Sequence, residues 1–330
     1  MRAAEYHLFS LRSLRGAAVL AWLALALAVQ AQTGTGATVR IVVPFTPGTG
    51  MDTIARTVAP RLAERLGQPV IVQNVPGASG NIGTDQVAKA PADGHTLLMS
   101  ANTMLIASQL YKNTPFDPIR DFAPVSMAAW GTLMLVAHPG AGIRSTAELI
   151  AKAKARPGHL VYGSPGVGTP HHMAMELFKV QTGIFALHVP YRGTAGYTQD
   201  LLGGELMVGF LPVHVAQSFV NSGRLVALAV GSASRHPVAP GVPTIAEAGV
   251  PGVDVDLWYA FFVPARTPPA MVRRLNAEIA AIIQLPEVRE VLGRAGMDAA
   301  HSTPEALRDV LAKDQPRWAA VIKRNNIAAE

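Results

Sequence analysis

One local pattern occurs four times in the sequence. A short β-branched or apolar run ends in a glycine-rich turn, and the turn leads directly into a segment with helical periodicity. The four turns are residues 44–50, 76–83, 163–169 and 190–196. Repeated strand–turn–helix units favour an α/β fold with largely parallel sheets. Glycine also allows a ligand to approach the backbone closely, beside helix N-termini that carry free N–H groups and partial positive charge. The turns therefore predict anion binding.

Hydrophobic periodicity and turn residues predict the remaining elements. We expect residues 117–124 to form a connection and residues 231–252 an irregular one. The last three helices each begin at a proline, a residue that is tolerated in the first turn, and Thr303 is the expected N-cap of the last helix. Strands are expected at residues 39–44, 69–73, 94–100, 133–137, 160–163, 187–190, 206–210, 224–230 and 257–263, and helices at 52–66, 84–90, 146–155, 170–182, 196–202, 269–284, 286–295 and 304–325.

The length of 330 residues exceeds what one core usually accommodates, which predicts two domains. We interpret the segments near residues 122–130 and 249–258 as crossings between the domains. They would make residues 38–128 and 250–330 a discontinuous first domain and residues 129–249 an inserted second one. Two crossings form a hinge, and the cleft between the domains is the expected ligand site.

The first segment has the layout of a secretory signal peptide. Arg2, Arg12 and Arg15 precede an apolar run over residues 16–29, and Val29 and Ala31 place small residues at the two positions that a signal peptidase reads. An uncleaved membrane anchor is the alternative, but the run is shorter than the roughly 20 residues of a spanning helix. We expect cleavage near Ala31 and a periplasmic protein. With no cysteine in the chain, lipidation is excluded.

Composition and motifs exclude several classes of function. Zero cysteines exclude disulfides and thiolate metal sites, and the net charge of +6 favours anionic ligands without the clustered basic residues of a nucleic-acid-binding protein. No G-x-S-x-G, phosphate-loop or dinucleotide-binding spacing is present, so no cofactor is expected. His172 and Glu176 are spaced like metal ligands but lack a third, so with His171 we expect a helix-start or cleft-lining role. Asp52 is expected to cap its helix rather than contact an anion.

Nine segments together resemble the Bug family, the substrate-binding components of tripartite tricarboxylate transporters. They follow one another along nearly the whole chain after the signal segment, at residues 42–52 (VVPFTPGTGMD), 74–83 (NVPGASGNIG), 92–98 (ADGHTLL), 121–125 (DFAPV), 161–169 (VYGSPGVGT), 188–193 (HVPYRG), 200–204 (DLLGG), 242–249 (VPTIAEAG) and 274–276 (RLN).

The resemblance implies a type II periplasmic-binding-protein fold, with two α/β domains closing on a small carboxylate. Two departures stand out: Thr49 replaces the second glycine of the usual P-G-G turn, and Leu211 stands where relatives often have aspartate, which argues against a ligand with an amino group. Carried over by position, the ligand-binding residues are Phe45, Thr46, Gly48, Thr49, Gly77, Ala78, Ser79, Asn81, Ser164, Gly166, Thr169, Tyr191, Gly193 and Thr194.

The expected function is therefore non-catalytic capture of a di- or tricarboxylate, or another organic acid, for membrane transporter subunits. The alternatives are an exported hydrolase and a receptor that reports to a membrane signalling partner. We expect a monomer that binds neither nucleic acid nor metal. If the backbone holds the anion, Ala78→Pro abolishes binding, and Arg192→Ala weakens it only modestly.

Overall fold

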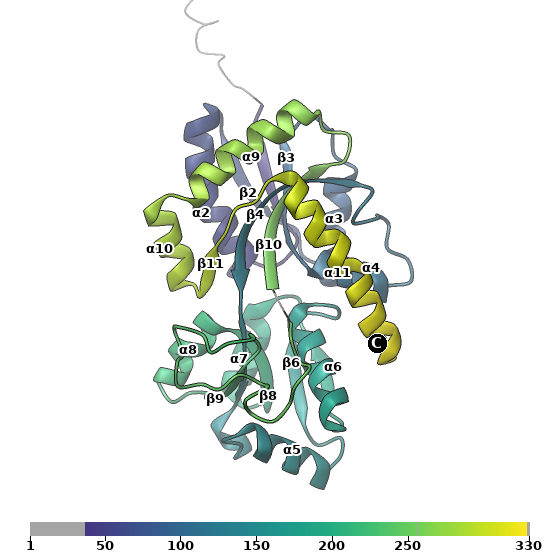
Figure 1. The fold of residues 1–330 in the computed structure, drawn as a ribbon, viewed down its shortest axis with the longest axis vertical. Coiled ribbons are helices and arrows are strands. Elements are labelled where there is room, and N and C mark those ends of the chain that lie inside the picture. The colour runs from purple at the N-terminus through teal and green to yellow at the C-terminus, as the bar shows by residue number, and fades with distance from the viewer. Residues whose placement is uncertain (1–36, 256, 329–330) are drawn as a thin grey trace, which may run out of the picture.

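The computed structural model describes residues 37–255 and 257–328, which form two β-sheets with helices on both faces of each (Figure 1). The predicted α/β fold class is confirmed. The predicted signal peptide, residues 1–31, lies outside the described residues. Within the described part of the chain, no helix combines the length and apolar character that a membrane crossing requires.

The first sheet has six strands. Its strands pair parallel only at the end where strands and helices alternate along the chain. β1 pairs parallel with β2 and β3, whereas β10 runs antiparallel to β3 and β4, and β11 antiparallel to β4. The strand order is β11 (Met297–Ala299), β4 (Phe122–Gly131), β10 (Leu257–Pro264), β3 (Thr96–Ala101), β1 (Val39–Val43) and β2 (Val70–Asn74).

Alternating side chains of these strands pack against helices on opposite faces. Ile41 and Val43 share a core with one set of helices, and Val42 faces the other. The first set is α2 (Gly50–Leu66), α9 (Pro269–Ile283) and α10 (Pro286–Arg294); the second is α3 (Asn81–Ala88), α4 (Thr103–Leu110) and α11 (Pro304–Arg324).

The second sheet has five strands and the same layered construction. β6 pairs parallel with β7 and β8, and β5 runs antiparallel to β8 and β9. Its order is β7 (Leu187–Pro190), β6 (Val161–Ser164), β8 (Val208–Pro212), β5 (Leu133–Ala137) and β9 (Val226–Val230). One face packs on α5 (Thr146–Ala155) and α6 (Pro170–Thr182), and the other on α7 (Thr194–Gly203) and α8 (Val213–Asn221).

The chain passes between the sheets at two adjacent places. Thr132 alone separates β4 in the first sheet from β5 in the second, and the return segment enters β10 at Leu257. Leu257 pairs with Gly131, so the two crossings lie side by side. The connection expected at residues 117–124 is wrong at its end, because β4 begins at Phe122, and the segment near residues 122–130 is a strand that leads directly to the crossing. The expectation of largely parallel sheets is also wrong: the strands that enter or leave the crossings pair antiparallel, so both sheets are mixed.

Helix boundaries follow the capping signals in the sequence. The predicted helices at residues 146–155 and 170–182 have the observed bounds, and the Thr303 side chain caps α11 as predicted by accepting from Ala306 N at 3.1 Å. α4, α8 and β11 were not predicted. α4 follows β3 after a single residue, Asn102, so no glycine or proline marks its start.

Candidate functional site

The first turn of α2 is held by reciprocal hydrogen bonds. Thr49, the N-cap, accepts from Asp52 N at 3.3 Å, and Asp52 Oδ2 accepts from Gly48 N at 3.0 Å. Gly48 adopts φ 84°, a left-handed conformation that favours glycine. This arrangement is a variant of the capping box, and it confirms the predicted capping role of Asp52.

The Asp52 carboxylate is saturated by protein donors. Arg56 Nε donates to it at 3.0 Å and Asn74 Nδ2 at 2.9 Å, and the residue is almost fully buried. Burial by itself raises the pKa of Asp52, but the hydrogen bonds from Arg56, Gly48 and Asn74 outweigh burial and lower the pKa below its ordinary value. The negative charge is thus held behind the first turn.

The N-terminus of α6, in the other sheet, is built in the same way. Thr169 is the N-cap and accepts from His172 N at 3.4 Å, and His172 Nδ1 accepts from Gly168 N at 3.2 Å. Gly168 has φ 77°, close to the value of Gly48. The sequences G-T-G-M-D and G-T-P-H-H therefore form equivalent helix starts, one in each half of the molecule.

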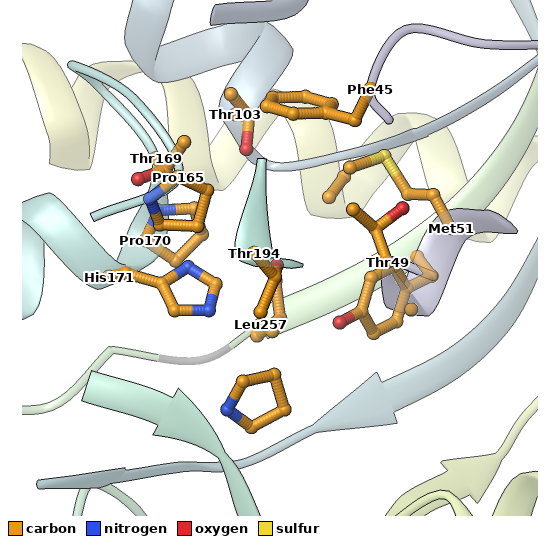
Figure 2. Close-up of a pocket in the computed structure, with 14 residues that line it drawn as sticks. Phe45, Thr49, Met51, Thr103, Pro165, Thr169, Pro170, His171, Thr194 and Leu257 are labelled. Carbon is orange, nitrogen blue, oxygen red and sulfur yellow. The ribbon is translucent and has the colours of Figure 1, made fainter. Parts of the chain in front are cut away.

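These two starts meet at one hollow, which we call the first hollow. About 370 Å³ of space lies between its lining atoms when the open solvent at its mouth is counted. The N-terminal residues of four helices border it: α2, α4, α6 and α7. Two of these helices belong to each sheet. Figure 2 shows Thr49, Thr103, Thr169 and Thr194, which lie at the four helix starts, around the hollow. Its lining residues are Phe45, Thr49, Gly50, Met51, Ala101, Thr103, Pro165, Thr169, Pro170, His171, Thr194, Pro212, Leu257 and Tyr259.

His171 is a lining residue absent from the predicted set of ligand-binding residues. The residue is 7% exposed, and its ring is turned toward the space that Thr49, Thr194 and Leu257 border (Figure 2). Neither Nδ1 nor Nε2 has a hydrogen-bond partner, and burial lowers its pKa to about 3, so the imidazole is neutral. From its place in the first turn of a predicted helix, the sequence predicted a helix-start or cleft-lining role for His171, but it did not predict ligand contact.

A second hollow lies next to the first and shares Phe45 and Pro165 with it. The glycine-rich turn at residues 76–83 borders this second hollow and not the first. Ala78 and Ser79 both have positive φ, and Ser79 Oγ lies 3.1 Å from Tyr111 Oη. The lining residues are Phe45, Gly77, Ala78, Ser79, Gly80, Tyr111, Pro165, Gly166, Val167, Pro190, Tyr191 and Arg192.

Five of the predicted binding residues line neither hollow. Gly48 N is bound to Asp52, and Asn81 begins α3. Ser164 is fully buried, with Oγ 2.7 Å from His188 Nε2. Gly193 and Thr46 face each other across the two halves, because an ideal Cβ on Gly193 would overlap Thr46 Oγ1.

The Ser164–His188 pair does not form a nucleophilic site. Ser164 is 0% exposed, and His188 Nδ1 has no acceptor to orient the ring. His188 instead stacks between Tyr162 and His172, with ring centroids 4.7 and 4.4 Å apart. Among the described residues, no group of three His, Cys, Asp or Glu side chains is placed to hold a metal ion.

Two α/β halves joined by adjacent crossings, with helix N-termini from both halves around one hollow, define a binding protein of the periplasmic type. Residues 54–327 match the model of the tripartite tricarboxylate transporter family receptor, TctC, and the chain belongs to this family. It is a solute-binding protein of a transport receptor family and not an enzyme.

Three relatives illustrate the likeness. The BugT protein of Bordetella pertussis is 36% identical, over 89% of this chain and 91% of its own. The structure of Rpa4515 of R. palustris with adipate is 34% identical with a TM-score of 0.84, covering 88% of this chain and 98% of that one. The structure of MatC from Rhodopseudomonas palustris with bound malate is 29% identical with a TM-score of 0.82, covering 86% and 98%.

Proposed function

We propose that the protein captures a small organic carboxylate in the first hollow, in the periplasm, and presents it to the membrane subunits of a tripartite tricarboxylate-type transporter. The observation that carries this proposal is the meeting of four helix N-termini, two from each sheet, around one hollow. Relatives solved with adipate and malate support the ligand class.

The carboxylate is best placed at the N-terminus of α2. Gly50 and Met51 occupy the first two helical positions, where N–H groups have no intrahelical acceptor, and both residues line the hollow. Thr194, from the other half, adds a further donor. Three charge-assisted bonds of ~1.5–3 kcal/mol each, less the cost of association, are sufficient for micromolar affinity.

The ligand we propose carries no amino group. An ammonium needs a carboxylate partner when it is removed from water. No Asp or Glu is among the described residues that line either hollow. Leu211, which prompted this expectation, is itself fully buried in the core beside Met134 and does not line the hollows, so the argument rests on the lining residues.

Eleven of the fourteen predicted binding residues divide into three groups under this proposal, and Gly48, Asn81 and Ser164 are assigned no contact with the ligand. Direct contact is assigned to Phe45, Thr49, Thr169 and Thr194, and residues 77–79 with Gly166 and Tyr191 border an extension into the second hollow. Thr46 and Gly193 act as a contact between the closed halves. The boundaries 38–128 with 250–330 and 129–249 remain our proposal for the two domains.

Export and assembly are also proposals. The family consists of periplasmic binding proteins, and removal of residues 1–31 would leave a chain beginning near residue 32. Osmotic shock followed by N-terminal sequencing tests this, and a cytosolic protein that retains Met1 contradicts it. We expect a monomer that contacts membrane subunits, which sedimentation and membrane pull-down measure.

Carboxylate capture is tested by native mass spectrometry of freshly purified protein, followed by thermal-shift screening of organic acids. We expect at least one acid to copurify or to raise the melting temperature, and to be recovered chemically unchanged. Failure of every mono-, di- and tricarboxylate to stabilise the protein contradicts the proposed function.

A further inference from the structure

The equivalent starts of α2 and α6 differ in one respect that bears on the ligand. The first helical position is Gly50 in α2 and Pro170 in α6. Proline has no N–H, so α6 loses the donor that α2 retains at this position. The third-position N–H is used in both helices, by Thr49 and by Thr169. α2 thus offers two free backbone donors, and α6 offers only His171 N.

The side chain beside that single donor is a neutral imidazole. Both ring nitrogens of His171 are buried without a partner, and the ring packs edge-on against Tyr197 at 6.2 Å between centroids. A buried polar group left unsatisfied is costly, so the arrangement favours a ligand that hydrogen-bonds to it. One nitrogen donates and the other accepts, which suits a hydroxyl or a carbonyl oxygen.

The walls of the first hollow supply no charged side chain near the start of α6. Among the described residues that line it, none is Asp, Glu, Lys or Arg, and the side chains other than His171, Tyr259 and the threonines are apolar. A second ionised group on the ligand would therefore lose water without gaining a cationic partner. An apolar ligand body gains from the same walls.

We propose that His171 sets the ligand preference of the first hollow: the favoured ligand has one carboxylate at α2, an apolar body, and an uncharged hydroxyl or carbonyl group at α6. This inference rests on the proposed carboxylate-binding function. It assigns the two ends of the ligand to different helices, with Pro170 weakening α6 as an anion site and His171 satisfying the neutral group.

The test compares acids that differ only at the far end. The unbranched monocarboxylates from butyrate to octanoate are each titrated beside the ω-hydroxy acid and the dicarboxylate of the same length, for example hexanoate, 6-hydroxyhexanoate and adipate. At the best length we expect the hydroxy acid to bind about tenfold more tightly than the monocarboxylate, and more tightly than the dicarboxylate. Tighter binding of the dicarboxylate overturns the inference.

Two variants of matched shape isolate the imidazole. His171→Leu should remove the advantage of the hydroxy acid over the monocarboxylate, and His171→Asn, which keeps a donor and an acceptor, should retain it. His159→Leu, on an exposed histidine outside both hollows, is the control and should change nothing.

Pro170→Ala restores the missing N–H and should shift the preference toward the dicarboxylate severalfold.

The outcomes separate the inference from the function beneath it. If acids bind but His171→Leu and His171→Asn have the same preferences as the original protein, carboxylate capture stands and the role of His171 is refuted. If no acid of the series or of the wider screen binds, the proposed function fails, and the inference fails with it.

Discussion

Substitutions at the contact between Gly193 and Thr46 test most directly whether the two halves close on the ligand. Gly193 has φ 154° and precedes Thr194 at the start of α7. An ideal Cβ at this position overlaps Thr46 Oγ1 and lies 3.2 Å from Thr46 Cβ. Gly193→Ala therefore moves the start of α7 away from the turn that holds Thr46.

The expected loss of affinity follows from the hydrogen bond between Thr194 and the ligand that the substitution removes. Displacing Thr194 removes about one charge-assisted hydrogen bond of ~1.5–3 kcal/mol, which corresponds to a roughly 10- to 100-fold loss of affinity. Thr46→Ala removes the overlapping oxygen and leaves only the 3.2 Å contact, which a shift of a few tenths of an ångström relieves. The double variant should recover affinity to within about threefold, because the backbone strain of about 1–3 kcal/mol is present in both the free and the bound protein and cancels in the affinity.

Isothermal titration calorimetry with the tightest-binding acid measures these affinities. Gly203→Ala is the control, because Gly203 lies in the same helix and a Cβ there meets nothing within 4 Å. Unchanged affinity in Gly193→Ala, or failure of Thr46→Ala to restore it, would refute the interpretation that this contact controls closure.

Two further predictions concern stability. Burial lowers the pKa of His172 and His188 from 6.5 to about 3. Their contribution to the free energy of unfolding is therefore complete above pH 6.5 and is lost as the pH falls toward 3. The loss is about 1.4 kcal/mol per histidine and pH unit. Urea unfolding between neutral pH and pH 5 should show this slope, reduced in His188→Gln and unchanged in His301→Gln, whose histidine is exposed. Asp52→Ala should lower the free energy of unfolding by about 3 kcal/mol, because Gly48 N and the other groups that donate to the Asp52 carboxylate lose their acceptor. A loss below about 1 kcal/mol would contradict the capping role.

Local signals in the sequence predicted the helices that begin with strong caps. Thr169 followed by Pro170, with Gly183 in the left-handed conformation after the last turn, defines α6 completely. β4 was missed because Pro124 and the aspartates before it are typical of a connection. In the structure Pro124 lies beside an irregularity in the pairing with β10, which accommodates a proline inside the sheet.

The site was predicted in part, and what was missed depends on tertiary arrangement. Three of the four glycine-rich turns contribute to the first hollow, but the turn at residues 76–83 borders the second, and Thr103 of the unpredicted α4 lies where that turn was expected. Ala78→Pro is also a weaker test than the sequence suggested. Ala78 has φ 46°, whereas proline requires about −65°, so the substitution rebuilds the turn as well as removing a donor.

The place of the hollow relative to the crossings explains why binding would change the shape of the protein. Leu257 lines the hollow and is also the residue at which the chain returns to the first sheet, paired with Gly131 at the end of β4. Under the proposed function, rotation about these strands would move α6 and α7 relative to α2 and α4. A ligand held between α2 and α6, as we propose, would contact both halves only when they are closed, so it would bind that state more tightly and shift the population toward it.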